Sequence, residues 1–373
     1  MSEKMKLGEI CNFINGRAFK PSEWDKKGLP IVRIQNLNDE NAEFNFCSKD
    51  IEDKYIIEDN QLLFSWSGTP GTSFGAFFWN RGKAVLNQHI FKVIPKININ
   101  IEFLRYLLNG NLDTIISKSH GGVGLQHITK RELEEIIVDI PDDKKQEYVA
   151  KTLNGITKII NSRKEQLKQF DEIIKSQFVE MFESGKYPKI KLGEEFDVSS
   201  GGTPSKNKQE YWNSNDISWI GSNMCQNKII YKNDGKYISY LGLENSSAKI
   251  YPIDTILIAL VGATIGKTAL LKFETATNQN IAGIQVSERF NAEYVYFAIQ
   301  NLYYKFTELG KGAFKMANLS FIRNLEISMP PIELQNQFAE IVKVIDKQKF
   351  ESVIKAEKEI EKIQKNIYYK WGR

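Results

Sequence analysis

Lys6-Leu7-Gly8-Glu9, close to the start of the chain, returns in the second half as Lys191-Leu192-Gly193-Glu194. Further along, Asn87-Gln88-His89-Ile90 is matched at nearly the same separation by Asn278-Gln279-Asn280-Ile281. Similarity at a fixed period is the signature of a repeated structural unit. Two copies of about 185 residues are too few and too long for a solenoid, which stacks units of roughly 20–50 residues. The sequence therefore predicts a single two-part module that is present twice.

A chain of 373 residues, 42% of them hydrophobic and 26% charged, is long enough for two hydrophobic cores. Its longest apolar run, residues 255–261, is much shorter than the roughly 20 residues of a membrane-spanning helix. Residues 1–4 begin no apolar signal segment. The three cysteines form no CxxC pair, and an odd number does not suggest a disulfide framework. We therefore expect a cytoplasmic protein that does not enter a membrane.

The charge balance is mildly basic, with a net charge of +4 and a sequence pI of about 8.6. This value permits a nucleic-acid partner without requiring one, because the distribution of charge over the surface matters more than the sum. None of the three histidines is spaced with cysteine, aspartate or glutamate as metal ligands are, so no metal site is expected.

Two long charged helices are expected, over residues 142–184 and 331–373, each directly after a proline. Apolar residues in both recur at alternating steps of three and four, which is typical of a coiled-coil seam, with one phase slip near 347–350. About 40 residues give a helix of about 60 Å. If the first helix leads away from one globular part, the second must lead back, so we predict an antiparallel pair. The predicted seam residues are Leu153, Ile160, Leu167, Ile174, Val342, Ile345, Ile360, Ile363 and Ile367.

Ahead of each long helix the pattern indicates a mixed α/β globular part. Strands are predicted at 31–35, 61–66, 217–220 and 256–260, glycine-rich turns at 68–75 and 262–266, and shorter helices at 101–117 and 292–309. The order is therefore globular part, long helix, globular part, long helix.

Three motifs suggest catalysis and are better explained otherwise. The stretch from Gly262 to Thr268 follows an apolar strand as a phosphate-binding P-loop does, but it has three residues between its glycines where the P-loop has four, which favours a strand-turn-strand connection. Residues 121–124 are predicted to be a flexible loop. Asp142 and Asp143 are adjacent at a predicted helix start, where aspartate complements the helix dipole. We therefore expect no catalytic residue in this chain.

Polar and aromatic clusters remain in both globular parts. Residues 199–206 combine hydroxyls, glycines and a lysine, which suits either a phosphate-binding surface or a plain turn. The carboxamides at 87–88 and 278–279 can pair with adenine in the major groove or can be buried structural groups. The candidate DNA-binding residues are Arg17, Lys20, Arg33, Gln35, Trp66, Asn87, Gln88, His89, Gly202, Thr203, Ser205, Lys206, Trp219, Lys267, Asn278, Gln279, Asn280, Lys311 and Lys315.

Several of these motifs occur together in one known family. They are, in chain order, Lys191-Leu192-Gly193-Glu194, Gly201-Gly202-Thr203-Pro204-Ser205, Trp219-Ile220, Gly262-Ala263-Thr264-Ile265-Gly266, Asn278-Gln279-Asn280 and Pro330-Pro331-Ile332-Glu333-Leu334-Gln335. With these motifs the chain resembles the specificity (S) subunits of type I restriction-modification systems, and its first half carries the same frame in a looser form.

The resemblance implies two target-recognition domains of mixed α/β (α+β) fold, residues 1–141 and 185–330, and two antiparallel spacer helices, residues 142–184 and 331–373. Each domain would read one half of a split DNA sequence. Two modification (M) subunits would bring S-adenosylmethionine, and a restriction (R) subunit would bring ATP and Mg. The chain itself would then hold no cofactor, and it would act at the nucleoid of a bacterium or archaeon.

Two further expectations follow. The polar residues at 17–20 differ from those at 203–206, so we expect an asymmetric bipartite target. The alternative is an adaptor protein with two ligand-binding heads on a coiled coil and no DNA. DNA binding that weakens steeply with salt would separate the two, because contacts with phosphates release counterions.

Overall fold

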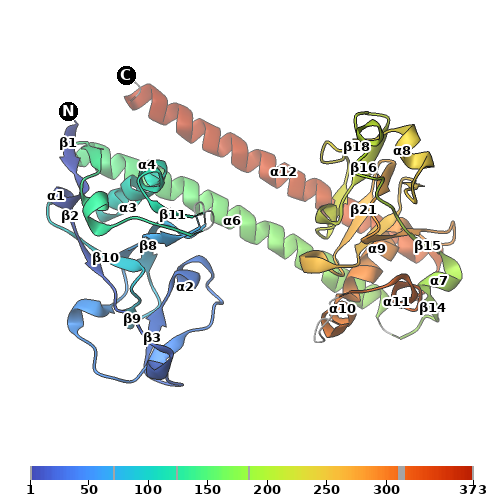
Figure 1. Cartoon of the computed structure of the whole chain (residues 1–373), viewed down its shortest axis with the longest axis horizontal. Coiled ribbons are helices and arrows are strands. Elements are labelled where there is room, and N and C mark those ends of the chain that lie inside the picture. The colour runs from blue at the N-terminus through green and yellow to red at the C-terminus, as the bar shows by residue number, and fades with distance from the viewer. Residues whose placement is uncertain (1, 70–71, 123–124, 184, 310–315, 372–373) are drawn as a thin grey trace. The chain divides into compact units, whose positions relative to one another are not determined.

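The chain folds into two compact units, residues 1–161 with 359–373, and residues 162–358 (Figure 1). The structure is a computed structural model that describes residues 2–69, 72–122, 125–183, 185–309 and 316–371. No helix among these residues is long and apolar enough to cross a membrane.

The first unit is built on a four-stranded antiparallel sheet with strand order β2-β10-β6-β8. A second sheet, in the order β4-β3-β9-β5, contains the parallel pair β3 and β9. Two smaller sheets have the orders β11-β12-β7 and β1-β13. The strands are β1 (Glu3–Lys6), β2 (Cys11–Asn15), β3 (Leu29–Val32), β4 (Asn45–Cys47), β5 (Ile56–Ile57), β6 (Gln61–Ser65), β7 (Ser67–Gly68), β8 (Gly75–Trp79), β9 (Ala84–Leu86), β10 (Ile90–Pro95), β11 (His120–Gly122), β12 (Leu125–His127) and β13 (Ile137–Ile140).

The larger sheets of the second unit repeat the order of pairings of the first unit, with one further strand, β17, added parallel to β21. The main sheet has the order β15-β23-β20-β21-β17, and the second sheet, β18-β16-β22-β19, again contains one parallel pair, β16 and β22. Strands β14 and β24 pair as β1 and β13 do. The strands are β14 (Lys189–Lys191), β15 (Asp197–Ser200), β16 (Ile217–Ile220), β17 (Lys228–Ile230), β18 (Tyr237–Ile238), β19 (Ile250–Tyr251), β20 (Ile256–Ala259), β21 (Thr268–Leu271), β22 (Thr275–Thr277), β23 (Ile281–Gln285) and β24 (Glu326–Ser328).

The helices include both long ones that the sequence predicts. The short helices are α1 (Leu7–Ile10), α2 (Ile34–Asn38), α3 (Ile101–Gly110), α4 (Leu112–Ser117), α5 (Lys130–Glu134), α7 (Leu192–Glu195), α8 (Tyr240–Glu244), α9 (Ala292–Asn301), α10 (Tyr303–Leu309) and α11 (Leu319–Arg323). The long ones are α6 (Asp143–Phe182) and α12 (Ile332–Trp371), each 40 residues. Neither is interrupted, although α6 contains Gly155 and α12 passes through the predicted phase slip.

Both shorter helices predicted ahead of the long ones are broken in two. The first breaks at Asn111, whose side chain donates to the Leu107 carbonyl and so competes with helical hydrogen bonding. The second breaks at Leu302, which has non-helical backbone angles. The predicted continuous helices over 101–117 and 292–309 are therefore wrong at these two residues.

The strand predicted at 31–35 is also corrected. Strand β3 ends at Val32, and the side chain of Asn36 accepts from the Arg33 amide to cap helix α2. Asn36 is fully buried, and its amide also donates to the carbonyls of Ala42 and Glu43. Arg33 precedes this helix and Gln35 lies within it, so they do not share a strand face.

The glycine-rich segment of the second unit is a hairpin connection. A single 3-10 turn, Gly262–Thr264, joins the antiparallel strands β20 and β21. A P-loop leads from a strand into a helix, so the strand-turn-strand interpretation is confirmed. In the first unit, Gly121 and Gly122 belong to strand β11, which corrects the loop expected there; residues 123–124 lie outside the described part.

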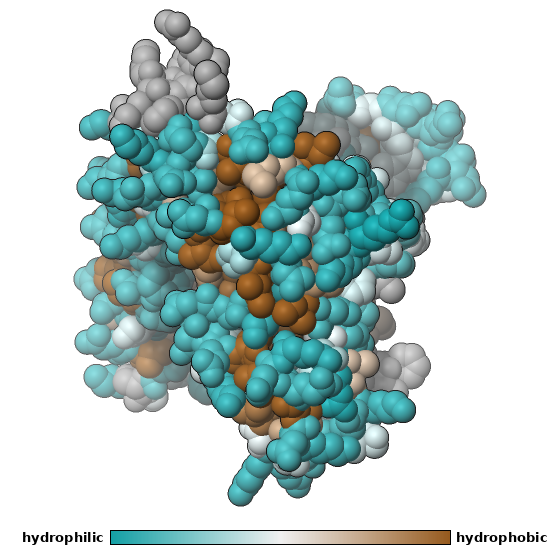
Figure 2. Space-filling model, turned by 90° about the vertical axis from the view of Figure 1, so that its left-hand side faces the viewer, coloured by the Kyte–Doolittle hydropathy of each residue, from teal (hydrophilic) through white to brown (hydrophobic). Residues whose placement is uncertain are grey.

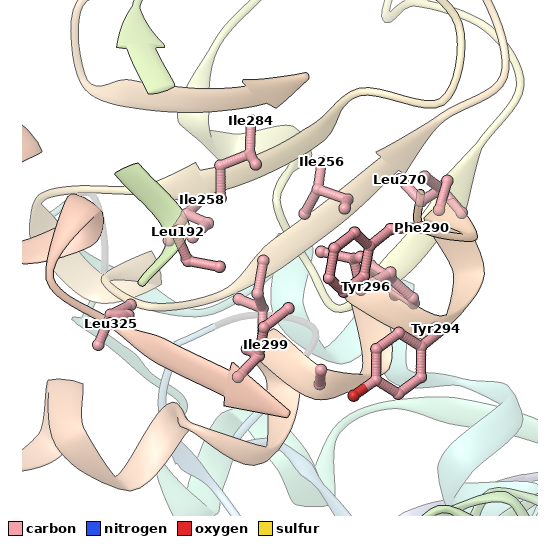
Figure 3. Close-up of a cluster of buried hydrophobic side chains, with 14 of the residues drawn as sticks. Leu192, Ile256, Ile258, Leu270, Ile284, Phe290, Tyr294, Tyr296, Ile299 and Leu325 are labelled. Atoms are coloured by element: carbon pink, nitrogen blue, oxygen red, sulfur yellow. The ribbon is translucent and has the colours of Figure 1, made fainter. Parts of the chain in front are cut away.

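The core of the second unit lies between the main sheet and helix α9 (Figure 3). Ile256 and Ile258 of β20 and Ile284 of β23 face Ile299 of α9. Phe338 of the long helix α12 is fully buried in the same cluster. Burying each large apolar side chain contributes about 1.5–3 kcal/mol. The beginning of this long helix is therefore part of the domain core.

Within the second unit, helices α6 and α12 contact each other. Phe178 packs edge-on against Phe338 at 5.4 Å between ring centroids, and Lys349 Nζ lies 2.8 Å from a carboxylate oxygen of Asp171. Burial alone would lower the pKa of Lys349, but hydrogen bonds to Asp171 and Asp346 outweigh burial and raise it. Residue numbers fall along one helix as they rise along the other, so the two are antiparallel over this stretch.

The predicted seam residues differ in burial. Ile174, Val342 and Ile345 are buried in the second unit, whereas Ile160 is 40% exposed. The remaining described members, Leu153, Leu167, Ile360 and Ile363, are partly buried, and the side chain of Ile367 lies outside the described part.

The three cysteines are all buried, two in the first unit (Cys11 and Cys47) and one in the second (Cys225). Burial raises the pKa of the thiols of Cys11 and Cys225 to about 12. Among the described residues, no three histidine, cysteine or acidic side chains are grouped so that they could hold a metal ion.

Candidate nucleic-acid interface

One loop junction recurs in both units with the same backbone hydrogen bonds. In the first unit the Arg17 amide donates to the Leu86 carbonyl at 2.9 Å. In the second unit the Gly202 amide donates to the Thr277 carbonyl at 2.8 Å. The residue before each of these, Gly16 or Gly201, bonds to the carbonyl of the strand residue after the Asn-Gln motif, Ile90 or Ile281. Arg17 and Gly202 therefore occupy equivalent backbone positions.

In the second unit this junction joins several predicted site residues. The Thr203 hydroxyl donates to Gln279 Oε1 at 2.5 Å, which ties the glycine loop to the Asn-Gln-Asn motif. Asn278 accepts from the Asn280 amide through its side chain at 3.1 Å. Gln279 is exposed, whereas Asn278 and Asn280 are partly buried. Gln279 is therefore the carboxamide of this motif that is most available to a ligand.

Gly202 and Trp219 shape the loop from inside. Both are buried, and Trp219 Nε1 donates to the Gly202 carbonyl at 3.0 Å. A Cβ atom on Gly202 would lie 2.4 Å from the Ala248 amide nitrogen, so only glycine fits there. The Gly202 amide is already bonded to the Thr277 carbonyl, so this amide is not available to a phosphate in this arrangement. Ser205 and Lys206, at the end of the loop, are exposed.

In the first unit the corresponding residues form an aromatic cluster. Trp66 Nε1 donates to Asn15 Oδ1 at 3.1 Å, and the rings of Trp66 and His89 meet at 5.4 Å. Gln88 Nε2 lies 3.3 Å from His89 Nε2. Burial, and then the nearby His127, lower the pKa of His89. The His89 imidazole is therefore expected to be neutral near pH 7.

Two atoms of this cluster are buried without a described hydrogen-bond partner, Gln88 Oε1 and His89 Nδ1. An unsatisfied buried polar atom costs about 1–3 kcal/mol. The neighbouring Asn87 is partly buried, and its backbone amide donates to the Val32 carbonyl. In this arrangement Gln88 Oε1 and His89 Nδ1 are not accessible to a base edge.

The basic residues of the first loop are partly engaged. The Arg17 guanidinium pairs with Glu23 and lies 4.7 Å from the centre of the Phe19 ring. A hydrogen bond from the Lys20 amide, together with Arg17, lowers the pKa of the Glu23 carboxyl despite partial burial. The Lys20 side chain is exposed and is available to a phosphate.

One aromatic residue on this side of the first unit was missed by the sequence analysis. Trp24 is 40% exposed, and the Arg33 guanidinium lies 5.7 Å from its ring. Residues 24 and 33 are brought together only by the fold, so no local pattern pairs them. Gln35 is exposed nearby in sequence, within α2.

Three lysine candidates remain, and the structure describes one of them, Lys267. Lys267, at the end of the hairpin turn in the second unit, donates to Gln226 Oε1 at 3.2 Å. Lys311 and Lys315 lie outside the described residues.

The family relationship rests on a match that covers most of the chain. The family model of the type I restriction modification DNA specificity domain matches twice, over residues 2–169 and 185–362.

The chain belongs to this specificity-domain family.

Named relatives agree with the match. The putative MjaX type I restriction enzyme specificity subunit of Methanocaldococcus jannaschii is 25% identical over an alignment 401 positions long, which covers 98% of this chain and 91% of that protein. The EcoBI specificity subunit of Escherichia coli is 27% identical over 175 residues, which is 46% of this chain and 36% of that subunit's length.

Two solved structures share the fold. The S subunit of a type I restriction-modification system from M. genitalium aligns with a TM-score of 0.56 at 13% identity, over 98% of this chain and 93% of that chain. A chain from a study of complex assembly and conformational transition of the type I R-M system aligns with a TM-score of 0.55 at 15% identity, over 98% and 95%.

The exposed candidate side chains at the two loop junctions of this specificity-domain chain are polar. One face of the molecule, by contrast, shows a band of apolar residues between hydrophilic ones (Figure 2). Protein–DNA interfaces are polar and positively charged, so an apolar band is a poor candidate for contact with DNA. The candidate interface is therefore the pair of loop junctions, with exposed Lys20 in one and exposed Ser205, Lys206 and Gln279 in the other.

Proposed function

We propose that this chain is the DNA-reading subunit of a type I restriction-modification complex and that each unit reads one half of a split, asymmetric target. The observation that carries the proposal is the loop junction present in both units with the same backbone bonds and different side chains. In this proposal the shared backbone frame would hold a reading loop in each unit, and the differing side chains would give each loop its own base preference.

The finer architecture belongs to the same proposal. We infer that the units are two copies of one module and that α6 and α12 pair as an antiparallel coiled coil along their length. The antiparallel contacts of Phe178 with Phe338 and of Asp171 with Lys349 support the pairing. A rod of about 60 Å is long enough to hold two readers one turn of DNA apart, about 34–36 Å.

Catalysis in this proposal belongs to partner subunits. Two modification subunits would supply S-adenosylmethionine and the methyl-transfer site, and a restriction subunit would supply ATP- and Mg-dependent cleavage. The relatives are named as specificity subunits of restriction enzymes, which supports this division of labour. The complex would act on the DNA of a bacterial or archaeal cytoplasm.

The experiment is single-molecule sequencing of DNA from cells that express this chain with its partner methyltransferase subunit. We expect methylated adenines in one split motif, and we expect them to disappear when this chain is omitted. An active methyltransferase that leaves no split motif would overturn the proposal and favour a DNA-free adaptor.

A binding measurement supplies an independent check. The affinity of the complex for DNA carrying the motif should fall steeply with salt, with a slope of log K against log[salt] that counts the neutralised phosphates. Affinity independent of salt would contradict a DNA-reading role.

A further inference from the structure

The strand that lies beside the Asn-Gln motif ends at an equivalent residue in both units. In the first unit the Asn87 amide donates to the carbonyl of Val32, the last residue of β3, at 3.1 Å. In the second unit the Asn278 amide donates to the carbonyl of Ile220, the last residue of β16, at 3.2 Å. The segments that follow these two strands therefore begin at the same place next to each loop junction.

The two segments carry different side chains. The segment after β3 contains the predicted site residues Arg33 and Gln35, whereas residues 221–227, after β16, contain none of the predicted site residues. Residues 221–227 nevertheless present exposed carboxamides, including those of Asn223 and Gln226. A carboxamide both donates and accepts hydrogen bonds, so it can read the edge of a base in the major groove. We call residues 221–227 the polar segment.

The polar segment is anchored to the second unit at its far end. Cys225 is fully buried in a hydrophobic cluster. The Asn227 amide donates to the Thr268 carbonyl of β21 at 2.8 Å, and Asn227 Oδ1 accepts from the Thr268 amide at 2.9 Å. Because the backbone is held in this way, less conformational entropy is lost when the exposed side chains bind a ligand.

Gly221 brings Asn223 close to the Asn-Gln-Asn motif. A Cβ atom on Gly221 would lie 2.7 Å from Asn223 Oδ1 and 3.6 Å from Asn278 Nδ2, so these two carboxamides are neighbours. Asn223 Nδ2 lies 3.5 Å from Asp234 Oδ2, which is longer than an ordinary hydrogen bond. The Asn223 carboxamide is therefore exposed and only weakly engaged, and it can offer an acceptor and a donor to a base.

A cation lies beside the other exposed carboxamide of the polar segment. Gln226 Oε1 accepts from Lys267 Nζ at 3.2 Å, and Gln226 Nε2 donates to the Asn223 carbonyl at 3.1 Å. Gln226 therefore links the Lys267 ammonium to the backbone of Asn223. The carboxylate of Asp234 pairs with Lys236 Nζ at 2.9 Å, which offsets its repulsion of a phosphate.

We propose that the polar segment is an additional DNA-reading segment of the second unit, in which Asn223 contacts a base of the second half-site and Lys267 contacts a phosphate. An asparagine pairs best with adenine, because it can donate to N7 and accept from N6 together. A lysine contact with a phosphate adds affinity without base preference. This inference rests on the proposed function.

The test of Asn223 measures the affinity of the assembled methyltransferase complex for DNA that carries the motif with each single base-pair substitution in either half-site. In Asn223→Ala, discrimination at one base pair of the second half-site should fall by about tenfold. Gly221→Ala keeps every polar group, and its methyl group displaces the Asn223 carboxamide. Alanine fits the backbone angles of Gly221, φ −99° and ψ 169°, so this variant should fold and should lose discrimination at the same base pair.

Asn324→Ala is the matched control. Asn324 is exposed at the end of α11, and its side chain donates to the Ser320 carbonyl of the same helix. This variant should keep the wild-type discrimination at every base pair. The inference is wrong if Asn223→Ala and Gly221→Ala also keep it, or if they lose discrimination equally in both half-sites.

Lys267→Met tests the phosphate contact. It should weaken binding to all targets alike and should reduce the slope of log K against log[salt] by about 1. An unchanged slope, or a changed base preference, would refute the contact of Lys267 with phosphate. Wild-type complex that binds no split motif would instead overturn the proposed function.

Discussion

Gln88 in the first unit and Gln279 in the second each follow an asparagine, but the two glutamines have different surroundings. Gln279 is exposed and accepts from the Thr203 hydroxyl, whereas Gln88 lies against His89 with its Oε1 buried. The Asn-Gln motif thus presents an exposed carboxamide in the second unit and a partly buried one in the first. We therefore expect the two readers to respond differently to substitution.

Replacing Gln279 should affect one half-site only. In Gln279→Ala, discrimination at one base pair of the second half-site should fall by about tenfold, because a carboxamide pairing with a base contributes about 1–3 kcal/mol. Methylation assays on targets with single substitutions in either half-site measure this effect. Gln337→Ala, exposed on α12, is the control, and equal loss in both half-sites would contradict the assignment.

The stability of the first unit should depend on pH through His89. Burial and His127 lower the pKa of His89, so the unfolded chain takes up this proton before the folded chain does. The contribution of neutral His89 to the free energy of unfolding is complete above the ordinary histidine pKa of about 6.5. It is lost as the pH falls from there through the lowered pKa of His89 in the folded unit. Denaturant unfolding of the first unit at several pH values measures it.

His89→Asn, which copies the residue at the equivalent position of the second unit, should reduce this pH dependence. The second unit is an internal control, because all three histidines of the chain lie at residues 89, 120 and 127 of the first unit. An identical pH profile for wild type and variant would show that His89 is not the group responsible.

At the scale of elements, the start of α12 is anchored by aromatic packing more than by charge. Phe338 is fully buried against Phe178 and Phe182 of α6, whereas Lys349 pairs with the exposed carboxylate of Asp171 and the partly exposed one of Asp346. Solvent screening weakens ion pairs with exposed partners, and a buried ring keeps its full packing energy.

Phe338→Ala should therefore destabilise the second unit by about 3–5 kcal/mol. Lys349→Met should cost less than about 1 kcal/mol, since the carboxylates it releases can be hydrated. Denaturant unfolding followed by a probe in the second unit separates these values. Val344→Ala on the exposed side of α12 is the control, and a larger cost for Lys349→Met than for Phe338→Ala would reverse the ranking.

Elements with a strong period were predictable from the sequence, and contacts distant in sequence were not. The long helices were found within a few residues, and the strand 217–220 was found as it stands, because each carries its own periodicity. The helix at Ile34–Asn38 was missed, since it depends on the buried side chain of Asn36 bonding to residues 42 and 43.

The candidate site was predictable to the same extent: local motifs could be recognised in the sequence, and contacts between distant segments could not. The Asn-Gln motifs and the residues 203–206 were visible as repeated or polar stretches. The burial of Gly202 and Trp219, and the meeting of Trp24 with Arg33, arise from segments that only the fold brings together. Gln335 belongs to a recognisable proline motif, but the hydrogen bond that its Oε1 accepts from the Asn291 amide cannot be predicted from spacing.

At the scale of the whole molecule, the chain consists of two units, each with its own sheets, core and loop junction. Substituting the residues of one loop junction should therefore leave the half-site read by the other unit unchanged.

Exchanging residues 197–330 for those of a related specificity subunit should change the second half-site and leave the first intact. Methylation sequencing of cells that express the chimaera with the partner methyltransferase gives both half-sites in one measurement. A change in the first half-site would contradict independent reading. The reciprocal exchange of the first unit's globular part is the matched control.

The burial of the three cysteines gives this protein a set of internal probes. The thiolate is the form of cysteine that attacks an alkylating reagent, so the raised pKa of Cys11 and Cys225 protects both thiols while their units stay closed. Labelling at Cys11 then reports the rate at which the first unit opens, and labelling at Cys225 reports the second. Mass spectrometry of the labelled peptides would measure the opening rate of each unit separately in the wild-type protein, with and without DNA.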